Sequence, residues 1–143
     1  MYRINKFGKR YKVKILLVDD NRVKLLACHK IIKKRLNIKS EMATHHEAAL
    51  RKFRKYRHNI IVLDILMPEK DGFQVASDIA RYCRKKHLKI PHMISYTVLE
   101  GEAIQAKAIN CGIDDYVPKT NPEELIKVIE KWLMFDNKSF AIY

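Results

Sequence analysis

The chain has 143 residues and a formal net charge of +13, with 29 Lys and Arg against 16 Asp and Glu. This length fits a single domain whose core needs no disulfides, and no uncharged apolar run approaches the ~20 residues of a membrane-spanning helix. The N-terminus is basic but lacks the apolar run of a secretory signal. The three cysteines are odd in number and widely spaced, which indicates a reducing compartment, and we expect the cytoplasm.

Segments typical of strands and helices alternate along the chain. In order, we expect a strand at 13–18, a helix at 21–36, a strand at 39–43, a helix opening at 44–47, a strand at 60–63, a helix at 72–86, a strand at 91–96, a helix at 101–110, a strand at 115–117 and a helix from 121. Five such units predict an α/β fold with a single doubly wound, five-stranded parallel sheet.

Capping signals support the expected helices. Asn21 is suited to cap the first helix, and Thr44-His-His-Glu47 has the spacing of a capping box for the second. Gly112 is expected to end the fourth helix in a left-handed conformation. The run Asn121-Pro-Glu-Glu124 predicts an Asn cap followed by Pro at the first helical position.

Two of the expected strands end on acidic residues. The apolar run 60–63 delivers Asp64 to the start of a Pro/Gly-marked loop, and the run 13–18 ends on Asp19 and Asp20. Because parallel strands end at one edge of the sheet, where ligands bind in open α/β folds, we expect the three carboxylates to meet there. Three anions need a cation or a proton between them, and Mg²⁺ with its preference for oxygen ligands is the natural partner.

The same residues carry a resemblance to a known family. The runs Ile15-Leu-Leu-Val-Asp-Asp-Asn21 and Leu63-Asp-x-x-Met-Pro-x-x-Asp-Gly72, followed by Thr97, Gly112 and Asp115-Tyr-Val-Pro-Lys119, resemble the receiver (phosphoacceptor) domain of two-component signalling. The resemblance implies a flavodoxin-like (βα)5 domain with strand order 2-1-3-4-5 over residues 13–134. A basic N-terminal extension, 1–12, and a C-terminal tail, 135–143, flank it.

The resemblance also implies roles for these residues. Asp64 is expected to accept a phosphoryl group from the phosphohistidine of a histidine kinase or histidine phosphotransfer protein. Mg²⁺ is expected on Asp19, Asp20, Asp64 and the backbone carbonyl of Leu66, and Lys119 is expected to pair with the acceptor carboxylate. The chain would be a stand-alone regulator or the receiver part of a hybrid histidine kinase.

A conformational switch is the second implication. Counting back from Lys119 places the switch hydroxyl on Thr97, whereas counting forward from Pro91 places it on Tyr96, and Ser95 is a third candidate. We favour Thr97, because a tyrosine is too long for the role. Tyr116 matches the switch aromatic on the fifth strand, and the fourth helix, fifth strand and fifth helix form a possible dimer surface.

One departure from the family pattern concerns the loop after the fifth strand. The family usually has Lys-Pro there, often with a cis peptide bond, whereas this chain has Pro118-Lys119-Thr120. A cis bond that precedes Thr120 would cost several kcal/mol, so we expect a trans bond and a loop of different shape.

Two alternatives differ in function. A haloacid-dehalogenase-like phosphatase also uses a strand-end Asp and Mg²⁺, but it would need an acid where Leu66 stands. A receiver-like module that only binds partners would not need the acids and Lys119. The basic residues are divided among the N-terminal arm and three helices on different faces of the sheet, so we expect no contiguous patch and consider nucleic-acid binding unlikely.

Overall fold

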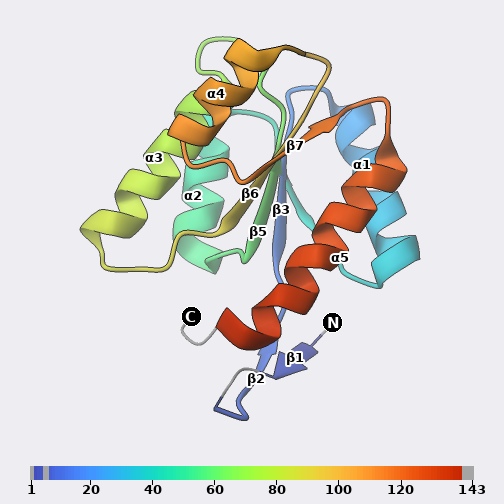
Figure 1. Ribbon diagram of the computed structural model, residues 1–143, viewed down its shortest axis with the longest axis vertical. Helices are drawn as coiled ribbons and strands as arrows, with labels where there is room; N and C mark the ends of the chain where they lie inside the picture. Colours follow the sequence, from blue (N-terminus) through green and yellow to red (C-terminus); the bar gives the residue numbers. More distant parts are fainter. Residues whose placement is uncertain (1, 5–6, 140–143) are drawn as a thin grey trace.

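A five-stranded parallel sheet forms the centre of the molecule, for which the computed structural model describes residues 2–4 and 7–139 (Figure 1). Its strands are β3 (Ile15–Val18), β4 (Glu41–Ala43), β5 (Ile60–Leu63), β6 (His92–Thr97) and β7 (Asp115–Pro118), in the spatial order β4-β3-β5-β6-β7. The helices are α1 (Arg22–Leu36), α2 (His46–Tyr56), α3 (Gly72–Lys85), α4 (Glu102–Asn110) and α5 (Pro122–Ser139). The predicted doubly wound fold and strand order are therefore confirmed.

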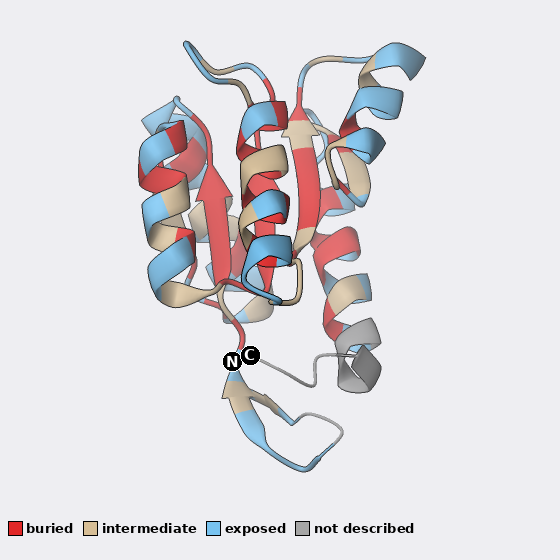
Figure 2. Ribbon diagram, turned by 90° about the vertical axis from the view of Figure 1, so that its left-hand side faces the viewer, coloured by how far each residue is buried: buried red, intermediate tan, exposed pale blue. Residues whose placement is uncertain are grey.

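The sheet is buried on both faces, because successive strand residues alternate between two cores. Leu16 and Leu63 belong to the core under α2, α3 and α4, whereas Leu17 and Val62 belong to the core under α1 and α5. This two-sided burial explains why the strands read as uninterrupted apolar runs. Figure 2 shows the buried strands enclosed by helices whose outer surfaces are exposed.

The strand register sets the position of the acidic residues. Val18 of β3 lies opposite Leu63 of β5, so that Asp19 and Asp64 follow their strands at the same level. The Asp64 N–H also donates to the Val18 carbonyl at 2.8 Å, which extends the ladder by one residue to the acid itself. The carboxyl edge of the sheet, where the strands end, is therefore the acidic end of the molecule.

Most of the predicted helix caps are confirmed. The side chains of Asn21 and Asn121 accept hydrogen bonds from backbone N–H groups three residues later, and Gly112 has a φ of 92° just beyond α4. The capping box at Thr44 was a wrong prediction. His45 caps α2 instead, since its Nδ1 accepts from the Ala48 N–H at 3.2 Å.

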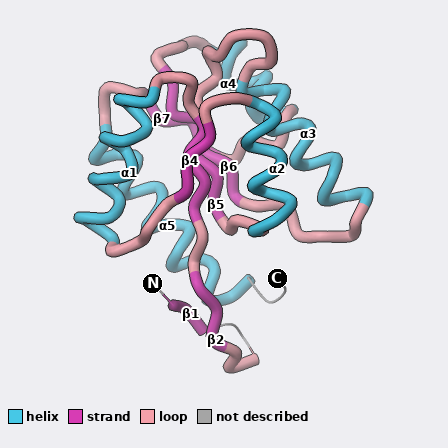
Figure 3. The backbone as a smooth tube through the Cα atoms, turned by 180° about the vertical axis from the view of Figure 1, so that it is seen from behind, coloured by secondary structure: helices cyan, strands magenta, loops and turns pink. Residues whose placement is uncertain are grey.

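Two elements extend beyond the expected unit. Residues Tyr2–Ile4 (β1) and Arg10–Lys12 (β2) pair as an antiparallel hairpin that projects from the sheet where its strands begin (Figure 3). Arg3 on the hairpin donates to the Leu133 carbonyl of α5. The last helix continues to Ser139, past Met134, where we expected the receiver unit to end. The boundaries of a separate receiver unit, 13–134, stay a prediction.

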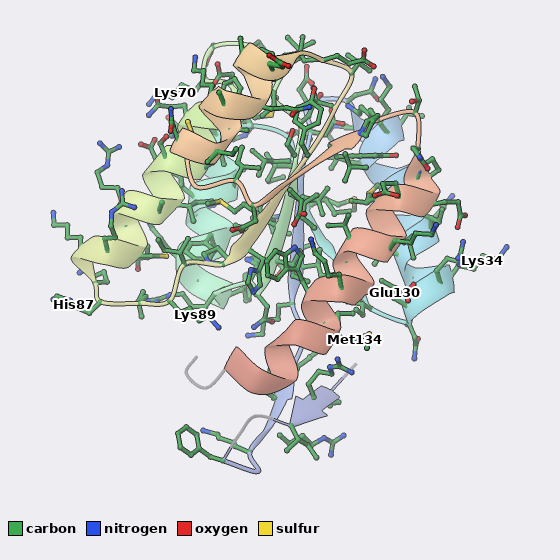
Figure 4. The ribbon with its side chains drawn as sticks, viewed as in Figure 1. Lys34, Lys70, His87, Lys89, Glu130 and Met134 are labelled. Carbon is green, nitrogen blue, oxygen red and sulfur yellow. The ribbon has the colours of Figure 1, made fainter. Side chains whose placement is uncertain are left out.

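We had expected the basic residues to be dispersed, but many of them gather at one end of the molecule. Strands lead the chain to the carboxyl edge and the helices return it, so α1, α2 and α3 all end toward the amino edge, where strands begin. Their last turns carry Lys and Arg, and the hairpin projects from the same end. In Figure 4, Lys34 lies on one side of this end, and His87 and Lys89 lie on the other. The three helices cover different faces of the sheet, but their carboxyl ends all lie at its amino edge.

His58 is a fully buried histidine near the amino edge. Its Nε2 lies 2.8 Å from Glu41 Oε1, and its ring packs on Phe53 and Tyr56. Burial lowers the pKa of His58 below its ordinary 6.5, although the hydrogen bond to Glu41 opposes this. The folded protein therefore favours the neutral ring more strongly than the unfolded chain does.

The lowered pKa of His58 predicts a pH-dependent stability. The contribution is fully present above the unfolded pKa of 6.5 and is lost as pH falls through the lower folded pKa. Between pH 7.5 and 5, His58→Gln should lose less free energy of unfolding than the unsubstituted protein, measured by urea unfolding. His87→Gln, which changes an exposed histidine, should keep the original pH dependence. Equal slopes for all three proteins would contradict the argument.

Candidate functional site

One lysine joins two buried carboxylates at the carboxyl edge. Lys119 Nζ lies 2.8 Å from Asp64 Oδ2 and 2.5 Å from Asp19 Oδ2. Burial lowers the pKa of Lys119, but the hydrogen bonds to Asp19 and Asp64 outweigh it and raise that pKa above 10.5. Lys119 is therefore a permanent cation at neutral pH, and it offsets part of the negative charge that the two strand ends bring together.

The third acid completes a cluster of oxygen ligands. Asp19, Asp20 and Asp64 each offer a carboxylate oxygen, and the three oxygens lie within 4.8 Å of one another. Asp20 is exposed, whereas the other two are buried. Three carboxylates exceed the single charge of Lys119, and oxygen ligands suit a hard divalent cation that keeps part of its water shell. The donor set therefore fits Mg²⁺, with Asp20 on the solvent side.

The cavity around these groups is small. It measures about 20 Å³ and is lined by Asp19, Asp64 and Lys119, with Cys28 and Tyr96 on the side toward α1 and α5. That volume suits one water or one small ion. Burial, and then the nearby Asp19, raise the pKa of the Cys28 thiol to about 12, so this cysteine is not a nucleophile at neutral pH. Asp64, in contrast, is a buried carboxylate that contacts the Lys119 ammonium group at 2.8 Å.

The loop after β5 holds Asp64 in place. The Leu66 N–H donates to Asp64 Oδ1 at 3.2 Å, and the Leu66 side chain is exposed. Asp71 caps α3, and the Gly72 N–H donates to the Ile65 carbonyl at 3.0 Å. A Cβ on Gly72 would lie 2.2 Å from the Asp64 carbonyl oxygen. The Asp-Gly pair therefore packs the start of α3 directly against the backbone of Asp64.

The candidates for the switch hydroxyl divide between the two faces of the sheet. Thr97 and Ser95 alternate with Tyr96, and only Tyr96 packs against the core under α1 and α5. Thr97 is fully buried, and its Oγ1 accepts from the Leu99 N–H at 3.3 Å. Ser95 lies opposite Tyr116 in the sheet register, and the buried hydroxyls of both residues have no hydrogen-bond partner among the described residues. Thr97 and Tyr116 thus occupy neighbouring strands on the same face.

The loop that carries Lys119 has a regular backbone. The described residues contain no cis peptide bond, so the Lys119–Thr120 bond is trans, as we expected. The Lys119 N–H donates to the Thr97 carbonyl at 3.0 Å, which continues the pairing of β7 with β6 past the end of the strand. This bond aligns Lys119 with the site, and it links the lysine to the backbone of Thr97.

Several residues in the cavity wall were not identified from the sequence, among them Cys28 and Tyr96. Cys28 appeared only as part of the apolar stripe of the first helix, and Tyr96 only as a rival for the switch hydroxyl. Strand alternation would have placed Tyr96 on the face of Val62, beside the acids, had the strand been read through Thr97. No signal in the sequence marks Cys28 as a wall residue, because the contact depends on how α1 crosses the sheet.

Comparison with known proteins shows which family the chain resembles. A family model described as "Response regulator receiver domain" matches residues 15–130. A "Probable transcriptional regulator ycf27" from Guillardia theta is 33% identical over 132 residues, which cover 90% of this chain and 48% of the relative. "Histidine protein kinase 1" from Candida albicans is 26% identical over 132 residues, 87% of this chain and 5% of that protein. The chain thus spans about half the length of the ycf27 relatives that it matches.

Solved structures have the same fold. A CheY-like receiver domain protein from Methanospirillum hungatei superposes with a TM-score of 0.76 and 24% identity, covering 88% of this chain and 97% of the other. The receiver domain of Ssk1 from Saccharomyces cerevisiae, solved with the histidine phosphotransfer protein Ypd1, superposes with a TM-score of 0.81 and 21% identity, covering 90% and 94%.

The close approach of Gly72 to Asp64 generates a test of the site's construction. Gly72→Ala should force the backbone of Asp64 or the start of α3 to move, since the added methyl group would overlap the Asp64 carbonyl. We expect a loss of about 1–3 kcal/mol in the free energy of unfolding, as for other overpacked positions. Arg84→Ala, on the exposed surface of the same helix, should change it by less than about 0.5 kcal/mol. Equal effects of the two substitutions would contradict the packing argument.

Proposed function

The chain belongs to the response regulator receiver domain family, and we propose that it takes a phosphoryl group from a phosphohistidine onto Asp64. The observation that carries the proposal is the contact of Lys119 with both Asp64 and Asp19 inside the acidic cluster. A carboxylate can act as a nucleophile and form an acyl phosphate, as in other aspartyl-phosphate systems. Phosphoryl transfer depends mainly on positioning and on neutralising the charge of the transferred group.

The residues have distinct roles in the proposed reaction. A carboxylate oxygen of Asp64 attacks the phosphorus, and the bond from phosphorus to the donor imidazole nitrogen breaks, with its electron pair going to that nitrogen. Lys119 moves its ammonium group from the free carboxylate toward the new phosphoryl oxygens, which its flexible stem allows. The exposed loop at Leu66 leaves the approach to Asp64 open to a partner.

A divalent metal completes the proposed site. Asp19, Asp20 and Asp64, together with the backbone carbonyl of Leu66, would hold Mg²⁺. When bound, the ion neutralises charge on the phosphoryl oxygens and orients them. Asp19 is already fixed for this role, because its Oδ1 accepts a hydrogen bond from the Asn21 N–H at 2.9 Å.

The partner we propose is a histidine kinase or a histidine phosphotransfer protein. Ssk1, one of the structural relatives, was solved with such a protein, Ypd1. In this chain, α1 exposes Val23 and Leu26 beside the acidic edge, with exposed fractions of 78% and 45%. An apolar helix face next to Asp64 is suited to a helical partner that must bring its phosphohistidine to that residue.

Phosphorylation would shift an equilibrium on the face formed by α4, β7 and α5. We propose Thr97 as the hydroxyl that binds the phosphoryl group and Tyr116 as the aromatic that follows it, since they lie on the neighbouring strands β6 and β7, on the face opposite Tyr96. The Tyr116 hydroxyl has no hydrogen-bond partner among the described residues, so no hydrogen bond opposes a rotation of this side chain. The same face is the proposed dimer surface, and Ile109 on α4 is 70% exposed there.

Substitution of the acceptor tests the proposal. With acetyl phosphate and Mg²⁺, the protein should gain the mass of one phosphoryl group, and hydroxylamine should remove it, because an acyl phosphate is labile to that reagent. Asp64→Asn should show no gain in intact mass spectrometry. Asp71→Asn, which keeps a side chain able to cap α3, should label like the original protein. Undiminished labelling of Asp64→Asn would move the acceptor elsewhere and exclude the proposed function.

Substitution of the exposed acid tests the metal. Mg²⁺ should raise the melting temperature of the protein by mass action, because it binds the folded state. Asp20→Ala should reduce this rise and should increase the melting temperature in the absence of metal, since it removes one of three repelling carboxylates. The measurement is a thermal-shift titration with MgCl₂, and NaCl of equal ionic strength is the control. The same Mg²⁺ response in both proteins would contradict the assignment.

A further inference from the structure

The amino-edge end of the molecule carries a concentrated positive charge. Four segments gather there, namely 9–14, 33–39, 54–57 and 84–89. They contain four, four, three and four Lys and Arg, and no Asp or Glu. We call the surface formed by these segments the basic pole. It holds just over half of the chain's 29 basic residues, while Asp19, Asp20 and Asp64 lie at the opposite edge.

Several acidic residues lie near the basic pole. Glu123 pairs with Arg35 of the pole at 2.6 Å, and Glu130 is exposed on the same side of the molecule as Lys34. Glu41 pairs with the buried His58 at 2.8 Å. Asp115 accepts hydrogen bonds from Lys131 Nζ at 2.7 Å and Trp132 Nε1 at 2.5 Å. Lys131 offsets the charge of Asp115, whereas the folded protein favours the neutral His58 ring, so Glu41 keeps its charge. The few acidic residues at this end are nevertheless outnumbered by the fifteen Lys and Arg of the four segments. The pole therefore presents a strongly positive field to the solvent.

Helix dipoles explain only part of this charge. Cations stabilise the carboxyl end of a helix, which accounts for Lys and Arg in the last turns of α1, α2 and α3. The hairpin contains no helix end, yet Lys9, Arg10 and Lys12 are all exposed on it. Basic residues on the hairpin therefore need another reason.

The hairpin also exposes apolar side chains. Tyr2, Ile4 and Phe7 are 56%, 61% and 72% exposed. In the strand pairing, Tyr2 lies opposite Lys12 and Ile4 opposite Arg10, so that apolar and cationic side chains share the outward face. The Arg10 guanidinium stacks 3.9 Å from the centre of the Tyr2 ring. Exposed apolar residues grouped on a projecting element indicate an interaction site.

We propose that the basic pole docks on an anionic lipid surface, with the hairpin's apolar side chains entering the headgroup region. Basic residues attract anionic headgroups over about 10 Å at 0.1 M salt, and apolar side chains add the contact that salt does not screen. In this orientation the cluster at Asp64 points away from the lipid. Its negative charge is then not repelled, and it stays open to a phosphodonor.

The arrangement favours a lipid surface over nucleic acid. The cations lie at the ends of three helices on both sides of the sheet, and Lys34 and Lys89 are on opposite sides of the molecule in Figure 4. Such a broad face matches an extended plane better than a single groove of a duplex, which admits one helix or ribbon. The exposed Ile4 side chain can enter a headgroup region, whereas it has no donor or charge with which to bind a phosphate of the nucleic-acid backbone.

Binding of the full chain to vesicles tests the proposal. The protein should cosediment with phosphatidylcholine vesicles that contain one third phosphatidylserine, and much less with pure phosphatidylcholine. Binding should weaken as the NaCl concentration is raised, because salt screens the attraction between the basic residues and the anionic headgroups. Arg10→Gln with Lys12→Gln should lower the affinity by about tenfold or more, since each basic residue near the surface is worth about fivefold. Ile4→Ser should also weaken it.

Matched variants separate the pole from net charge and from damage to the hairpin. Lys85→Gln with Lys86→Gln, at the end of α3, leaves the hairpin intact and should weaken binding like the hairpin pair. Lys70→Gln with Lys107→Gln removes the same charge near the opposite end and should have little effect; Lys70 is labelled there in Figure 4. Equal losses in all charge variants, or equal binding to both kinds of vesicle, would overturn the proposal. So would tighter binding to mixed-sequence duplex DNA that Ile4→Ser leaves unchanged.

Discussion

The repulsion among three carboxylates at one sheet edge is the constraint on which the site depends. Asp19 and Asp64 are buried, and a buried charge is costly unless it is paired. Lys119 supplies one positive charge to both, and the loops around the site serve to hold that arrangement. The negative charge that remains suits a divalent cation, which the proposed phosphoryl transfer would use.

Strands β6 and β7 connect the site to the rest of the molecule. The Lys119 backbone bonds to the Thr97 carbonyl, and Thr97 shares its face with Tyr116. A new charge on Asp64 would therefore act on a lysine and a hydroxyl that are already tied to the strands next to α4 and α5. Tyr96, on the other face, fills the wall of the same cavity, so both cores of the sheet contact the site. Since packed cores move between discrete arrangements, a local change of charge can bias the whole face.

Much of this architecture could be predicted from the sequence, because it depends on local patterns. Buried strands that end on Asp19 and Asp64 predicted both the doubly wound sheet and the acidic edge. The cap of α2 could not be predicted, since His45 competes with Thr44 through a side-chain geometry that propensity does not describe. The hairpin and the basic pole were missed for another reason. Both depend on where distant segments end in space, and the helix ends converge only once the parallel topology is known.

A structure with Mg²⁺ and beryllofluoride, which imitates a phosphoryl group on a carboxylate, tests the central claim most directly. The account predicts beryllofluoride on a carboxylate oxygen of Asp64 and Mg²⁺ in contact with Asp19, Asp20 and the Leu66 carbonyl. It also predicts that the Lys119 ammonium group contacts a fluorine. The account would be contradicted by beryllofluoride bound to another residue, or by a metal held away from the three carboxylates.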